Sequence, residues 1–251
     1  MPAPSRRPHP RSRRSLRLAP ALGLLLAAGL ALAEAPRSES KVFGALNAEA
    51  GVEYGSLSTV NGGITVQAGA RVRGAETVNG GISLGEGAEV GKAETVNGGI
   101  TLANRVRLGQ AETVNGGIRI GEACEIDGSV ETVNGGIRIG QGSRVGRNAD
   151  TVNGAITLEG AVVRGRVRTV NGDILLDKGA EAGSIQVEKP NRGWWNWGTE
   201  TLPRVVIGRD ARVHGPMVFE REVRLFVHAS ARIGEVQGAT PVRYEGDEAP
   251  L

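Results

Sequence analysis

Three tryptophans form the most unusual chemical feature of this sequence. Trp194, Trp195 and Trp197 lie within four residues of one another, and residues 59–187 before them contain no aromatic residue. Indole rings stack on sugars, sit at membrane interfaces or anchor protein contacts, and otherwise they pack on the fold that carries them. We take these three residues as the candidate contact site for a glycan or a partner protein.

A second set of residues with polar side chains repeats along the chain. The hexapeptide T-V-N-G-G-I begins at Thr59 and recurs, later as T-V-N-G-A-I and T-V-N-G-D-I, with its asparagines 18 or 19 residues apart. Asparagines at equivalent corners can form a ladder of side-chain hydrogen bonds. A Thr and Asn array that orders water, as in ice-binding β-helices, is the alternative. The predicted ladder consists of Asn61, Asn79, Asn97, Asn115, Asn134, Asn153 and Asn171.

An acidic residue precedes the threonine in most of these units, and Arg168 ends the row. Stacked carboxylates repel one another, and solvent and salt reduce the cost. The row is therefore expected to be a solvated edge that discourages sheet aggregation. A weak strip for divalent cations or a cationic partner is the alternative, although the ligand cage of a calcium loop is missing. The row is Glu76, Glu94, Glu112, Glu131 and Asp150.

Catalytic residues cannot be assembled from this sequence. His214 and His228 fall in different units near the C-terminus, and we expect His228 to point outward. No nucleophile is paired with a base, and no zinc spacing or phosphate-binding loop is present. Cys124, the one cysteine, takes a slot that holds Ala or Val in neighbouring units, which favours a small buried residue. We expect no enzymatic activity, no metal and no cofactor.

The repeat itself predicts the elements that position these residues. In the unit from Thr59 to Glu76 the apolar positions, taken as inward, are separated by glycines, so each unit reads as three short strands joined at three corners. Short strands cannot bury a face alone, but each can pair with its equivalent in the next unit. We predict an all-β fold, a single-stranded parallel β-helix with about 18 residues per coil. The inward positions are Val60, Ile64, Val66, Ala70 and Val72.

The period also predicts the organisation of the chain. Ten coils are expected, of which the first is a degenerate cap, and the stack continues beyond the tryptophan insertion. The predicted segments are a secretory signal peptide at 1–33, a linker at 34–40, a β-helix with a cap coil and seven T-V-N-G coils at 41–187, the tryptophan-rich loop at 188–203, two terminal coils at 204–236, and a tail or cap at 237–251.

The first 33 residues have the composition of an export signal. Six arginines precede an apolar run that ends in Ala31-Leu32-Ala33, which predicts cleavage before Glu34. General secretion is favoured over twin-arginine export, for which Ser12-Arg13-Arg14 is a partial match. Removing the six arginines changes the formal net charge from +3 to −3, so nucleic-acid binding loses its support. We expect a periplasmic or cell-surface protein of a bacterium, with no transmembrane span in the mature chain.

The last two units carry a family resemblance. V-V-I-G-R-D-A-R-V-H-G at 205–215 and V-H-A-S-A-R-I-G-E-V at 227–236 resemble the bactofilins, the polymer-forming cytoskeletal proteins of bacteria. The T-V-N-G-x-I units resemble adhesin-like bacterial repeat proteins. The resemblance implies a right-handed helix, whereas the 18-residue period alone also suits left-handed hexapeptide helices.

These observations predict a non-enzymatic, exported structural protein that self-associates end to end or scaffolds partners in the cell envelope. The export signal and the tryptophan loop depart from the bactofilin pattern. An adhesin-like module that binds a glycan or a partner through Trp194, Trp195 and Trp197 is the alternative.

Overall fold

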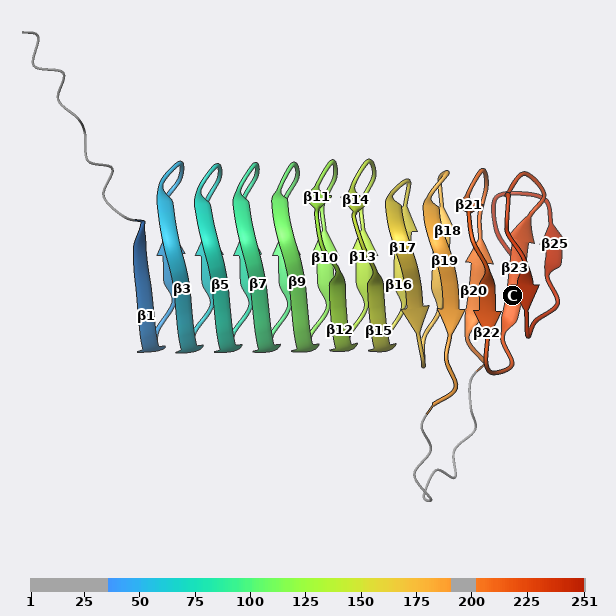
Figure 1. The fold of residues 1–251 in the computed structure, drawn as a ribbon, viewed down its shortest axis with the longest axis horizontal. Coiled ribbons are helices and arrows are strands. Elements are labelled where there is room, and N and C mark those ends of the chain that lie inside the picture. Colours follow the sequence, from blue (N-terminus) through green and yellow to red (C-terminus); the bar gives the residue numbers. More distant parts are fainter. Residues whose placement is uncertain (1–35, 191–201, 251) are drawn as a thin grey trace, which may run out of the picture. The chain divides into compact units, whose positions relative to one another are not determined.

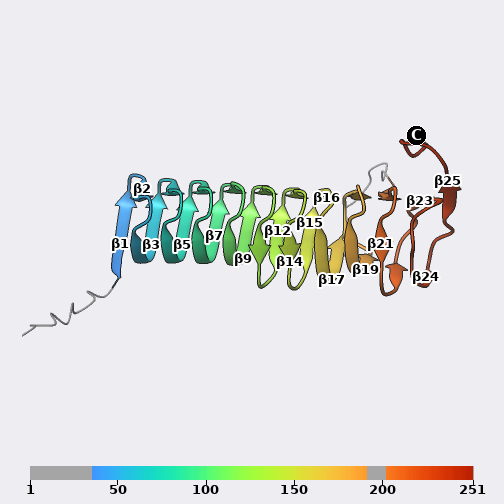
Figure 2. The ribbon, with the colours of Figure 1, turned by 90° about the horizontal axis from the view of Figure 1, so that it is seen from above.

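The computed structural model describes residues 36–190 and 202–250, and this part of the chain contains strands and no helix. The strands form two parallel sheets, which run side by side along one coil axis (Figures 1 and 2). The second sheet has 11 strands, one for each coil, so the predicted parallel β-helix is confirmed, with about 11 coils. Within the described ranges, no helix is available that could cross a membrane.

The first sheet contains the long strands and their divided equivalents. It has 14 strands, which are β1 (Arg37–Phe43), β3 (Glu53–Asn61), β5 (Arg71–Asn79), β7 (Glu89–Asn97), β9 (Arg107–Asn115), β11 (Glu125–Ile126), β12 (Val130–Asn134), β14 (Arg144–Val145), β15 (Ala149–Asn153), β17 (Val162–Thr169), β19 (Glu181–Val187), β21 (Arg212–Val213), β22 (Met217–Phe219) and β24 (Val236–Gln237).

The second sheet contains the short strands that follow each T-V-N-G corner. Its members are β2 (Leu46–Ala48), β4 (Ile64–Val66), β6 (Ile82–Leu84), β8 (Ile100–Leu102), β10 (Ile118–Ile120), β13 (Ile137–Ile139), β16 (Ile156–Glu159), β18 (Ile174–Asp177), β20 (Arg204–Ile207), β23 (Arg224–His228) and β25 (Val242–Tyr244).

A regular coil has two strands rather than the three expected. In β5 the side chains alternate until Gly74 and Ala75, which are both buried, so the strand bends there without ending. The bend merges the second and third predicted strands. In the 19-residue coils the equivalent buried positions are four positions apart in the sequence, as Ile126 and Val130 are, and not three, as Leu108 and Ala111 are. The long strand there divides into β11 and β12.

The core is one continuous stack of small and aliphatic side chains from both sheets. In the short strands, equivalent residues align from coil to coil without a shift, as Ile64 does with Ile82 and Ile82 with Ile100. Burial therefore depends on a common register, because a one-residue slip would turn inward side chains outward. This register also places equivalent outward side chains in columns parallel to the coil axis.

At both ends of the stack, strands occupy segments that were not predicted to contain them. β1 begins at Arg37, inside the segment expected to be a linker, and it pairs with β3. β25 lies in the expected tail and pairs with β23, which adds the coil that the count of ten omitted. After β25 the chain turns back along the last coils, where Arg204 donates to the Ala249 and Pro250 carbonyls at 2.9 and 2.8 Å.

Candidate functional site

The T-V-N-G corner places its threonine inward and its valine outward. Thr59 is 2% exposed, whereas Val60 is 40% exposed, and the next four units repeat this difference. The prediction that Val60 points inward was wrong. The chain turns between Asn61 and Ile64, so alternation counted backwards from Ile64 does not continue through the corner.

Each buried threonine hydroxyl has a partner in the coil before it. Thr95 Oγ1 donates to the Gly80 carbonyl at 2.8 Å, and the corresponding bonds in the seven units span 2.8 to 3.3 Å. A buried hydroxyl is stable only when it is hydrogen-bonded, and this bond also satisfies a corner carbonyl. The threonines cannot belong to a water-ordering surface array, because they are buried.

The asparagines lie on the outside of the same corner and are linked from coil to coil. Asn79 Nδ2 donates to Asn61 Oδ1 at 2.9 Å, and the six successive links span 2.8 to 3.0 Å. Beyond the last unit, Arg221 donates to Asn171 Oδ1 at 2.9 Å. Each of the five inner amides uses one donor and one acceptor within the ladder, so the ladder holds the corners in register.

The two glycines of the corner have different roles. A Cβ on Gly80 would overlap the Gly62 carbonyl oxygen, so this position requires glycine for close approach of the backbones. A Cβ on Gly81 would lie 3.2 Å from the Gly99 oxygen, which small adjustments can relieve. Accordingly, the first glycine is present in every unit, and the second is replaced by Ala155 and Asp173.

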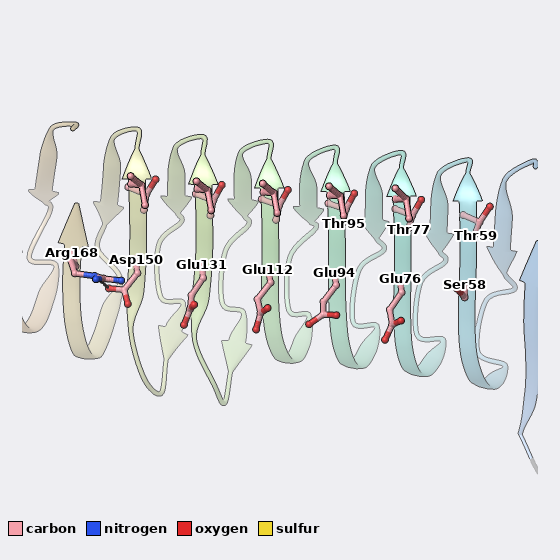
Figure 3. Close-up of a pocket in the computed structure, with 18 residues that line it drawn as sticks. Ser58, Thr59, Glu76, Thr77, Glu94, Thr95, Glu112, Glu131, Asp150 and Arg168 are labelled. Carbon is pink, nitrogen blue, oxygen red and sulfur yellow. Dashed lines mark ion pairs between the residues drawn. The ribbon is translucent and has the colours of Figure 1, made fainter. Parts of the chain in front are cut away.

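The acidic row forms an aligned column on the outer face of the long strands (Figure 3). Glu76, Glu94, Glu112, Glu131 and Asp150 are consecutive partners in the parallel register. Between this column and the exposed valines runs a trough of about 540 Å³, which extends from Ser58 to Arg168 and has the threonines along it. The trough combines carboxylates and exposed valines in successive coils, and we take it as the candidate functional site.

The electrostatics of this column reflect its like charges. Partial burial raises the pKa of Glu112, and the neighbouring carboxylates of Glu94 and Glu131 raise it further. Lys92 provides one local counter-charge, because its Nζ lies 2.5 Å from Glu94 Oε1, and this contact raises the lysine pKa. The acidic column therefore accommodates an ammonium group beside its carboxylates.

One end of the trough is closed by arginines. Asp150 is almost buried, and its carboxylate lies 3.3 Å from Arg166 and 3.4 Å from Arg168. Arg168 also pairs with Glu188 at 3.1 Å. The acidic run therefore ends in a compensated cluster, as Figure 3 shows for Asp150 and Arg168.

A different column of charges lies before the bend of the long strands, and it was not predicted. Its members alternate in sign and are consecutive register partners, and Arg71 and Glu89 form an ion pair at 3.1 Å. Cross-strand pairs of opposite charge are favourable. Reading the sequence from Glu53 in steps of 18 residues, with a last step of 19, reveals the pattern. The column is Glu53, Arg71, Glu89, Arg107, Glu125 and Arg144.

The histidines and the cysteine have structural partners. His214 Nε2 lies 3.0 Å from Glu181 Oε2. His228 was predicted to be outward, but it is only 7% exposed because Tyr244 of β25 packs edge-on against its ring at 5.2 Å. Cys124 is buried and forms no disulfide, its Sγ donates to the Ala103 carbonyl at 3.1 Å, and burial raises the pKa of its thiol. Among the described residues, no cluster of three or more His, Cys, Asp or Glu could hold a metal ion.

The candidate contact residues Trp194, Trp195 and Trp197 lie outside the described residues. Comparison with known proteins finds no matching family model, no matching curated protein and no matching solved structure. The fold and the trough must therefore support any functional interpretation by themselves.

Proposed function

We propose that this chain is a non-enzymatic structural protein, exported to the bacterial cell envelope, which scaffolds a partner along its repeated outer face. The solenoid architecture supports a bactofilin-like or adhesin-like role, in which a stiff array of equivalent coils provides many equivalent contacts. The partner chemistry that the trough suits is cationic and partly apolar, because acidic groups and exposed valines line its two sides.

The repetition of the outer face carries this proposal. Val60, Val78, Val96, Val114 and Val133 are each 40% exposed, and all five lie in the same place in successive coils. Catalysis concentrates different groups at one point, whereas this surface repeats one arrangement along a line. Exposed apolar side chains gathered in one patch typically mark a binding surface.

A retention experiment tests the proposal. The chain with its own N-terminal segment is expressed in a bacterial host, and its distribution between soluble and envelope fractions is measured. The triple variant Val60→Lys, Val78→Lys and Val96→Lys replaces three of the five exposed valines and offsets part of the negative charge of the trough with three lysines. We expect wild type in the envelope fraction and at least a tenfold loss of retention for this variant.

The same coils supply a matched control. Thr65→Lys, Ser83→Lys and Thr101→Lys add the same charge to exposed positions of the short strands β4, β6 and β8. This control should stay with the envelope, and circular dichroism should show that both variants fold. Equal retention of the two variants would mean that the trough is not the contact, and a soluble wild type would contradict the envelope role.

A further inference from the structure

The N-terminal end of the stack is an open sheet edge. β1 pairs only with β3 among the described strands, and its seven residues are exposed or, at Glu39, partly exposed. Val42 and Phe43 are 61% and 77% exposed. An unpaired edge of this length is a template for another strand.

The backbone groups at this edge have a defined direction. Gly44 donates its N–H to the Asn61 carbonyl of the next coil at 2.9 Å. Because these groups alternate along a strand, the N–H and C=O of Glu39, Lys41 and Phe43 face the free edge. An incoming strand must therefore bond to these residues.

The side chains at the edge are not those of a regular coil. Glu39 aligns with Leu57, and Lys41 aligns with Thr59, so both charged residues take inward positions. Within one chain, Arg37 pairs with Glu39 at 3.1 Å, and Lys41 Nζ donates to the Ala45 carbonyl at 3.1 Å. A regular coil stacked here would bury these charged side chains and would place no opposite charge against them, so the edge disfavours head-to-tail growth.

We infer that two copies of this chain join head to head through β1, in an antiparallel pair centred on Ser40. This register places Glu39 opposite Lys41 of the second copy, and Lys41 opposite its Glu39. The contact therefore contains two pairs of opposite charge. It also uses the free backbone groups of these residues as hydrogen-bonded pairs. Registers centred on Glu39 or Lys41 oppose like charges instead. The inference deepens the proposed structural role and rests on it.

The contact is expected to stop at two copies. At the other end of the stack, β24 has two residues and β25 has three, so neither offers an edge that matches β1. The residues after β25 are held along the coils, where Arg209 and Asp247 form an ion pair at 2.6 Å. The association is a closed, two-fold dimer in which one surface meets itself.

Charge reversal tests the register. Multi-angle light scattering of the chain should give the mass of a dimer, whereas Glu39→Lys and Lys41→Glu should each give a monomer because like charges then face each other. The double variant Glu39→Lys with Lys41→Glu restores complementarity and should dimerise again. An equimolar mixture of the two single variants should form a heterodimer. We expect each single variant to weaken dimerisation at least tenfold.

A second variant reports the two-fold position directly. In this register Ser40 faces itself in a non-hydrogen-bonded pair, with the short Cα separation that suits a disulfide. Ser40→Cys should therefore cross-link under mild oxidation, and Val42→Cys should not. A wild-type monomer at every concentration, failure of the double variant to restore the dimer, or growth into filaments would overturn the inference. A monomer that still sediments with the envelope would leave the scaffold role standing without the dimer.

Discussion

Two columns of charge run along the same stack of coils, and they follow opposite rules. In the column that begins at Glu53 each residue faces a partner of opposite sign, as Arg71 does with Glu89. In the column that begins at Glu76 each carboxylate faces another carboxylate. Both columns lie on the outer side of the first sheet, and their members have the same coil-to-coil spacing.

The comparison separates charge pairs that stabilise the fold from charge pairs that destabilise it. The alternating column proves that this chain can neutralise neighbours at the spacing of adjacent strands, about 4.8 Å. The acidic column keeps unfavourable contacts, because Glu94 and Glu131 add to the effect of partial burial in raising the pKa of Glu112. Since the fold does not need these like charges, they are most simply explained as part of a surface for a cationic partner or as a guard against aggregation.

The largest effect is expected from breaking the register that both columns share. Gly80→Ala would push a methyl group into the Gly62 carbonyl and separate adjacent coils. We expect the free energy of unfolding to fall by about 3 kcal/mol, as for a severely overpacked site. Urea denaturation followed by circular dichroism measures this loss.

Gly81→Ala is the matched control for that change. Its methyl group would lie 3.2 Å from the Gly99 oxygen, and Ala155 already occupies the equivalent position in another coil. Its effect should stay within about 0.5 kcal/mol. Equal losses for the two variants would show that close approach at the corner does not set the register.

Charge reversal should change stability in opposite directions in the two columns. Arg107→Glu places a third carboxylate between Glu89 and Glu125, and we expect a loss of about 1 kcal/mol. Glu112→Arg places a cation between Glu94 and Glu131, and we expect a gain of up to about 1 kcal/mol. Urea denaturation at low salt and at about 0.5 M salt measures both, and the differences should shrink as screening increases.

The neutral variants Arg107→Gln and Glu112→Gln serve as controls, because each removes a charge without adding the opposite one. Their effects should have the signs of the reversals and be smaller. If Glu112→Arg lowered stability as Arg107→Glu does, repulsion within the acidic column would not be the reason.

The sequence was enough to predict the coil but not every inward side chain. The 18-residue spacing predicted the parallel solenoid, and Ile64, Val66, Ala70 and Val72 are buried as expected. Val60 was assigned inward because hydrophobicity suggested it, yet the corner inverts the alternation. A buried Thr59 costs little because its hydroxyl reaches the Gly44 carbonyl at 3.1 Å, a partner supplied only by stacking.

The candidate site was partly visible in the sequence. The acidic residues and asparagines were found from their positions in the repeat, but the trough depends on the outward turn of Val60 and its equivalents. The inward charges of Glu39 and Lys41 were hidden because β1 has no T-V-N-G unit to set its register. Such positions become clear only when strand pairing is known.

The smallest effect is the pH dependence of Glu112, whose pKa is raised by partial burial and further by the carboxylates of Glu94 and Glu131. Its pKa in the folded protein is raised above the ordinary value of 4.5, so between these two values the folded chain holds more protons than the unfolded chain. The free energy of unfolding must then fall as pH rises through this window and recover as pH is lowered. Glu112→Gln removes this contribution, so the stability of wild type relative to Glu112→Gln should increase as the pH falls from neutral towards 4.5. Parallel stability curves for the two proteins would mean that neither burial nor the neighbouring carboxylates oppose the ionisation of Glu112, and the like charges of the column would then have no energetic cost at this position.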